Sequence, residues 1–154
     1  MEHKTQVIAE EGKQEILITR TFDLPLELLY KAYMEPELIE QWMGTKVLKL
    51  EFRKHGSYQF VTTDHRGNQH GFNGVIHDAI LNQRIIRTFE MENKPFGVQL
   101  EVYEFEKITE NSSRLQQKII YQSVAQRDEN LKLPFKQGIN WAHNRLQELV
   151  KTLN

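Results

Sequence analysis

The stretch DLPLELLYKAYMEPELIEQWMG, residues 23–44, contains two short apolar segments that each follow a proline. In both segments the apolar residues repeat as i, i+1, i+4 and i+5, which places them on one face of an α-helix. These residues are Leu28, Leu29, Ala32 and Tyr33 in the first segment, and Leu38, Ile39, Trp42 and Met43 in the second. Isolated helices shorter than about 12 residues are marginal in water. The stretch therefore predicts two short helices that the rest of the fold must hold in place.

Alternating apolar and polar residues on both sides of this stretch predict an antiparallel sheet. One predicted strand, EILITRTF at residues 15–22, precedes the helices, and the others follow them at residues 47–53, 57–63, 71–80, 84–91, 98–108 and 113–123. Turn residues such as DHRGN at residues 64–68 fit hairpin connections. Between Val102 and Tyr103 the apolar residues change parity, which predicts a β-bulge or a strand buried on both sides.

The last segment predicts one long amphipathic helix over about residues 134–152. Its apolar residues step by three or four along the chain, and they are Phe135, Ile139, Ala142, Leu146, Leu149 and Leu153. Strands followed by a helix, without strand–helix alternation, indicate the α+β class. We therefore expect a curved antiparallel sheet of about six or seven strands wrapped around the long C-terminal helix. The two short helices would fill the gap where the sheet opens, with Trp42 plugging or rimming that gap.

Length and composition exclude several classes of protein. The 154 residues are expected to form one domain, with a polar lead-in at residues 1–14 that could be flexible. The chain has no cysteine, which excludes disulfides, thiolate catalysis and cysteine-ligated zinc. Lys and Arg number 20 against 21 Asp and Glu, so the basic excess of a nucleic-acid binder is missing. There is no secretion signal and no apolar run of about 20 residues, so we expect a cytoplasmic protein without a membrane span.

The order of the motifs resembles the START-like (SRPBCC, helix-grip) superfamily, in the branch related to the C-terminal domain of activators of the heat-shock chaperone ATPase. RTFDLPLELLYKAYMEPELIEQW resembles the opening of that branch, GFNGVIHDAILNQRIIRTFE its central pair of strands, and HGSYQF its Gly-Gly-x-aromatic turn, with His55 in place of the first glycine. The matching residues of the opening are Arg20, Phe22, Pro25, Pro36, Glu37 and Trp42. QGINWAHNRLQELV is similar to the closing Gly-Trp helix, although Ile139 and Asn140 separate Gly138 from Trp141.

This resemblance spans about residues 16–153 and implies a helix-grip fold with a cavity between the sheet and the long helix. It does not imply one activity. Members of the superfamily bind lipids, hormones or polyketides, a few catalyse reactions, and others bind a chaperone.

Aromatic residues are the strongest candidates for a binding site in such a cavity. The eight that we expect to converge on it are Trp42, Tyr58, Phe60, Phe89, Tyr103, Tyr121, Phe135 and Trp141. Any one of them could be ordinary core. However, Tyr and Trp carry a polar atom that needs a partner when buried, and several of them beside one cavity favour a ligand pocket with a few polar anchors.

Arg87 and Gly138 complete the candidate ligand-binding residues. In RIIRTFEM, residues 84–91, either choice of inward face includes a charged residue. If Arg87 faces inward it must be paired or serve a ligand; the alternative is a position at the rim, where its head reaches water. Gly138 interrupts the long helix at a cost of roughly 1 kcal/mol relative to alanine. It could allow a close approach to the sheet, widen the mouth of the cavity, or simply be tolerated.

Three functions remain open. The first is a binding protein for a small hydrophobic or amphipathic molecule, which the aromatic candidates favour. The second is an interaction module that docks on a chaperone ATPase, which rests on the resemblance alone. The third is a cyclase- or hydrolase-type enzyme acting on a cavity-bound substrate, and the sequence offers it no convincing acid, base or nucleophile motif. None of the six histidines has metal-ligand spacing, so neither a metal site nor a cofactor is expected.

Overall fold

The computed structural model describes residues 3–153, which form an α+β structure. Its strands are β1 (Gln6–Ile8), β2 (Glu15–Phe22), β3 (Lys46–Leu50), β4 (Ser57–Thr63), β5 (Gln69–Ile80), β6 (Arg84–Met91), β7 (Val98–Thr109) and β8 (Ser112–Ile120). Its helices are α1 (Leu26–Met34), α2 (Pro36–Met43), α3 (Val124–Leu131) and α4 (Phe135–Lys151). Residues 1–2 of the predicted lead-in and residue 154 of the predicted domain lie outside the described residues.

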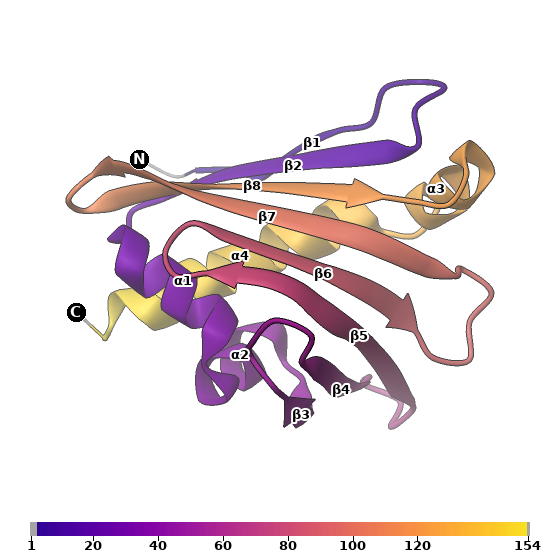
Figure 1. Ribbon diagram of the computed structural model, residues 1–154, viewed down its shortest axis with the longest axis horizontal. Coiled ribbons are helices and arrows are strands. Elements are labelled where there is room, and N and C mark those ends of the chain that lie inside the picture. Colours follow the sequence, from indigo (N-terminus) through magenta and orange to yellow (C-terminus); the bar gives the residue numbers. More distant parts are fainter. Residues whose placement is uncertain (1–2, 154) are drawn as a thin grey trace.

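The strands form one open antiparallel sheet in the order β1-β2-β8-β7-β6-β5-β4-β3. The long helix α4 crosses one face of this sheet (Figure 1). Helices α1 and α2 lie near the C-terminal end of α4, and α3 lies near its N-terminal end. The predicted fold class is confirmed, with eight strands rather than six or seven. The additional strand is β1, which falls within the polar lead-in and pairs with β2 at the edge of the sheet, Val7 opposite Ile18.

The two short helices form where the proline-led segments predict them. Pro25 is the N-cap of α1, and Pro36 is the first residue of α2, where a missing N–H breaks no hydrogen bond. Gly44 ends α2 in the left-handed conformation, at φ 64°. The Trp42 indole donates a hydrogen bond to the Ala32 carbonyl at 2.8 Å, and this bond ties the two helices together inside the core.

The buried face of α4 differs in part from the predicted stripe. Leu146 is buried as expected, but the other fully covered positions are His143 and Val150. Leu153 lies beyond the helix and is 50% exposed, so its assignment to the buried stripe is wrong. Helix α3 was not predicted; it begins at Ser123, whose hydroxyl accepts a hydrogen bond from the Gln126 amide.

The predicted bulge in β7 is absent at Val102 and Tyr103, because the register with β6 and with β8 runs unbroken through both residues. The inner, buried face of β7 carries Gln99, Glu101, Tyr103 and Phe105. Leu100, on the outer face, is 36% exposed, so the strand is not buried on both sides. The change of parity therefore arises because the inner face is polar at Gln99 and Glu101.

Candidate functional site: a pocket beneath the long helix

A pocket of about 430 Å³ lies between the inner face of the sheet and the N-terminal half of α4. Small residues on the helix explain why the space is there. Gly138 and Ala142, one turn apart, both line the pocket, and a Cβ added at Gly138 would meet nothing within 4 Å. The C-terminal half of the helix instead inserts Leu146 and Val150 into the core. Gly138 is exposed and borders the pocket, and the space in front of it is open, so the alternative of a close helix–sheet approach at this position is wrong.

The sheet side of the pocket contains a buried ion pair. Arg87 on β6 stands directly opposite Glu101 on β7, and its Nε donates to Glu101 Oε1 at 3.1 Å. The side chains are 14% and 5% exposed, respectively. Arg87 therefore does not reach water at a rim but is paired within the fold.

Two further residues complete the hydrogen bonds of this ion pair. The Tyr103 hydroxyl donates to Glu101 Oε1 at 2.7 Å and accepts from Arg87 Nη2 at 2.7 Å. The Gln99 amide donates to the other carboxylate oxygen, Oε2, at 2.9 Å. Because both oxygens of Glu101 are engaged, the buried carboxylate is held in one orientation.

Aromatic rings also favour the charged form of Arg87. The guanidinium carbon lies 4.8 Å from the Tyr58 ring centroid and 5.0 Å from that of Tyr103. Burial alone would lower the pKa of Arg87, but Tyr103, Tyr58 and Glu101 outweigh it and raise the pKa. Burial raises the pKa of Tyr103 well above its ordinary value, so this phenol stays neutral.

Three other polar side chains face the pocket without a partner. Gln117, on β8, stands opposite Tyr103, and Tyr33 and Tyr121 line the same space. No hydrogen bond joins any of these three side chains to another residue within 3–153. Burial raises the pKa of both tyrosines, so their hydroxyls remain neutral donors. Their polar atoms are not among the fully enclosed ones that lack a partner, so they open onto the pocket, where they can hydrogen-bond to a ligand or to water.

Most of the predicted ligand-binding residues line this pocket. Those that do are Trp42, Phe60, Arg87, Phe89, Tyr103, Tyr121, Phe135 and Gly138. Tyr58 does not line it: its ring stands beside Arg87, and its hydroxyl donates to the Thr88 carbonyl at 2.5 Å. Their part in binding a ligand stays a prediction.

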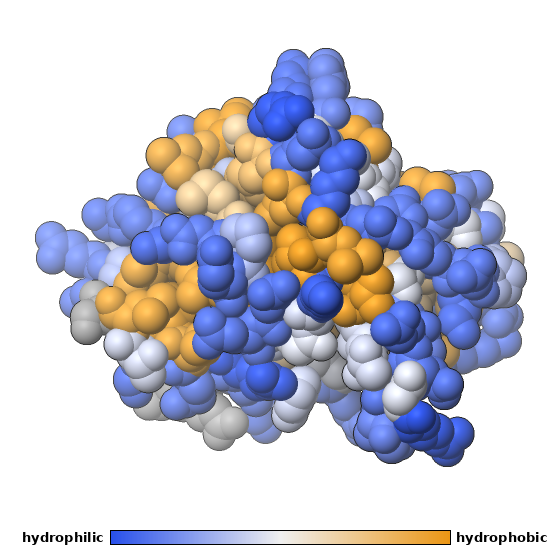
Figure 2. Space-filling model, turned by 90° about the horizontal axis from the view of Figure 1, so that it is seen from below, coloured by the Kyte–Doolittle hydropathy of each residue, from blue (hydrophilic) through white to orange (hydrophobic). Residues whose placement is uncertain are grey.

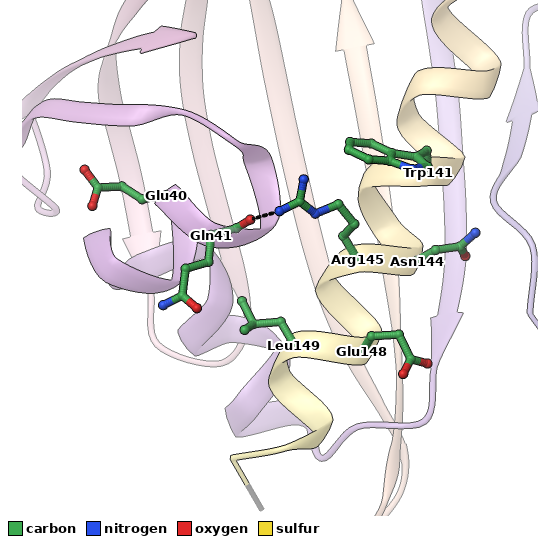
Figure 3. A pocket seen from close by; sticks show the side chains of 7 residues that line it. All are labelled: Glu40, Gln41, Trp141, Asn144, Arg145, Glu148 and Leu149. Carbon is green, nitrogen blue, oxygen red and sulfur yellow. Dashed lines mark hydrogen bonds between the residues drawn. The ribbon is translucent and has the colours of Figure 1, made fainter. Parts of the chain in front are cut away.

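Trp141 was predicted to face the pocket, but the structure places it on the outer side of α4, 58% exposed. It follows the pocket-lining Ile139 by two residues, which is about 200° around the helix. Figure 3 shows it in a surface groove between α2 and α4, next to Arg145. The Arg145 guanidinium lies 4.9 Å from the Trp141 ring centroid and donates to the Gln41 carbonyl at 2.6 Å.

The sequence analysis did not identify Glu101, Gln99 or Gln117 as site residues, although each is a polar residue at a core-facing position of its strand. Glu101 and Gln99 lie at alternate positions of β7 that face the core. Gln117 stands between Leu115 and Ile119 on the buried face of β8. In both strands, a polar residue at a core position indicates a candidate functional residue, because such residues are rarely buried without a reason.

Among residues 3–153, no three His, Asp or Glu side chains gather closely enough to hold a metal ion. None of the helices over the same residues is long and apolar enough to cross a membrane.

Comparison with known proteins gives a family and a fold. A family model described as "Activator of Hsp90 ATPase homolog 1-like protein" matches residues 23–151. No match was found among curated proteins. Among solved structures, a protein from Mycobacterium smegmatis is similar with a TM-score of 0.86 and 19% identity, over 95% of this chain and 96% of that one. A protein from Rhodobacter sphaeroides is similar with a TM-score of 0.85 and 20% identity, over 98% and 100% of the two chains. The structural similarity establishes the helix-grip fold, and at these low sequence identities it establishes nothing beyond the fold.

Proposed function

We propose that this chain, which belongs to the family of Activator of Hsp90 ATPase homolog 1-like proteins, binds a small hydrophobic or amphipathic molecule in the pocket beneath α4. The observation that carries the proposal is the pocket itself. It combines a mostly apolar lining with a few buried polar groups, of which Gln117, Tyr33 and Tyr121 have no partner within residues 3–153. Small-molecule sites have this composition.

A thermal-shift screen with apolar and amphipathic compounds tests the proposal. A ligand that binds only the folded protein stabilises it by about 2.7 kcal/mol at a hundred times its dissociation constant. For a domain of this size, that corresponds to a rise in melting temperature of about 5–10 °C. If a broad library of such compounds leaves the melting temperature unchanged, the proposal fails.

Substitutions at Gly138 locate the binding site. Gly138→Leu should fill part of the pocket and abolish the ligand-induced shift, because nothing else occupies the space in front of this residue. Gly138→Ala is the matched control, since it also improves helix propensity relative to glycine but adds only a single methyl group. The alanine variant should melt at or above the wild-type temperature and keep most of the shift. A full shift in a folded leucine variant would place the ligand elsewhere.

The exposed Trp141 favours a second candidate function, docking on a partner protein such as a heat-shock chaperone. Apolar patches lie among charged side chains on the face of the molecule shown in Figure 2, and Trp141 is exposed beside the groove between α2 and α4. Tryptophan and arginine are the residues that most often dominate binding energy at interfaces. Trp141→Ala should then weaken binding to a purified chaperone at least tenfold, while Leu153→Ala, at another exposed site, should not. Absence of binding by the wild type would rule this function out.

A further inference from the structure

The charges in the pocket cancel. Of the residues that line it within the described chain, only Arg87 and Glu101 carry an ionised side chain. They are paired with each other at 3.1 Å. Both oxygens of Glu101 already accept hydrogen bonds. The pocket therefore offers no cation in excess to a ligand anion, and no anion in excess to a ligand cation.

The polar groups left for a ligand are neutral. The Gln117 amide can donate and accept, and the Tyr33 and Tyr121 hydroxyls can each do both. All three side chains are buried and line the pocket. Gln117 stands opposite Tyr103 on the neighbouring strand, beside the ion pair, so neutral donors and acceptors adjoin the ionic network.

We infer that the pocket selects ligands whose polar group is uncharged, such as an alcohol, a ketone or an amide on an apolar body, and disfavours carboxylates and ammonium ions. This inference rests on the proposed function. A ligand carboxylate would either remain an unpaired charge in a buried site or compete with Glu101 for Arg87. Both outcomes cost free energy that a neutral group avoids. Gln117, Tyr33 and Tyr121 can satisfy a hydroxyl or carbonyl without disturbing the ion pair.

Three probes of one chain length test the inference on the wild-type protein: decan-1-ol, decanoate and decylamine, titrated at pH 8 by calorimetry. At this pH the carboxylate and the amine are both ionised, as side-chain carboxyl and amino groups are. The alcohol should bind at least tenfold more tightly than either charged probe. Binding of decanoate or decylamine as tightly as the alcohol would overturn the inference while leaving the proposed function intact. If none of the three probes binds, the inference fails, because decan-1-ol should bind; the thermal-shift library alone decides the proposed function.

Two variants, each lacking one charge of the Arg87–Glu101 ion pair, should change the ligand preference in opposite directions. Glu101→Gln keeps the size of the side chain but leaves Arg87 without its anion, so the affinity for decanoate relative to decan-1-ol should rise at least tenfold. Arg87→Gln leaves Glu101 without its cation and should raise the relative affinity for decylamine in the same way. Each variant is first shown to be folded by a cooperative melting transition, and either one suffices if the other does not fold.

Glu104→Gln is the control for a change of net charge alone. Glu104 lies on the same strand as Glu101 but is exposed on its outer face, so this substitution should leave the affinity ratios at their wild-type values. If a folded Glu101→Gln or Arg87→Gln variant gives the wild-type ratios, the ion pair does not set ligand charge and the inference is wrong.

Discussion

His143 should make the protein less stable as the pH falls from neutral to mildly acidic values. This residue belongs to α4, and its imidazole is fully buried. The ring packs edge-on against Phe22, with 5.5 Å between the ring centroids. Its Nδ1 is hydrogen-bonded to the Thr5 hydroxyl at 2.6 Å. Burial, with a smaller contribution from the nearby positive charge of Arg20, lowers the pKa of His143 to about 3. The folded protein therefore holds this ring neutral, whereas the unfolded chain titrates near its ordinary pKa of about 6.5.

The sign and size of the effect follow from proton linkage. Between pH 6.5 and the lowered pKa, the unfolded chain binds one more proton than the folded protein, so the free energy of unfolding rises with pH. The stabilising contribution is complete above about pH 6.5 and is lost as the pH falls towards the folded-state pKa of about 3. The limiting slope is about 1.4 kcal/mol per pH unit, which amounts to about 2 kcal/mol between pH 7.5 and pH 5.0.

Urea unfolding at pH 7.5 and pH 5.0 measures this difference. Glu51 and Asp64, whose pKa values are lowered to about 2, affect stability only where unfolded carboxyls take up protons, near and below about pH 4. His143→Gln removes the titrating group and should flatten the pH dependence over this window, whatever its cost at pH 7.5. His65→Gln, at an exposed histidine, should keep the wild-type dependence. If the wild type and His143→Gln lose the same free energy between the two pH values, the burial of a neutral imidazole is not the cause.

Two further predictions concern the buried face of α4 and the place of Trp42 in the pocket. Leu146→Ala should lower the free energy of unfolding by about 2–5 kcal/mol, since the side chain is fully buried. The control, Leu153→Ala at a half-exposed site, should lower it by less than about 0.5 kcal/mol. Equal losses for the two variants in urea unfolding would contradict the assigned buried face of α4. In a Trp141→Phe variant, Trp42 is the remaining tryptophan of the two in the chain, and its emission should change when decan-1-ol fills the pocket that it lines. Unchanged emission at saturation, with binding confirmed by calorimetry, would assign Trp42 to core packing alone.

Local patterns were enough to predict most of the fold. The spacing of apolar residues and the positions of Pro25 and Pro36 predict α1 and α2 because both act within a few residues of the chain. Strand β1 escaped prediction because its three residues are an edge strand with little burial of its own. Helix α3 escaped because its buried residues, Arg127 and Asn130, are polar and leave no apolar stripe. Arg127 instead donates to the backbone carbonyl of Glu10, a contact that no local pattern reveals.

The candidate site was less predictable because it depends on which strands are neighbours. Trp141 was misplaced because aromatic character alone does not tell the inner from the outer face of α4. Arg87 could be recognised as a charge that needed a partner, but its partner could not be named. Glu101 is 14 residues further along the chain, and only the pairing of β6 with β7 places it opposite.

The polar residues of the pocket share one property that a sequence does display. Glu101, Gln99 and Gln117 each occupy a position whose parity assigns it to the core. A core position filled by a polar residue is costly unless a partner is supplied, and departures from the local rule of this kind are expected at functional sites. Here the departures fall on the adjacent strands β7 and β8, and all three side chains line the pocket. Polar residues gathered at core positions around one otherwise apolar pocket support the proposal that the pocket binds a ligand.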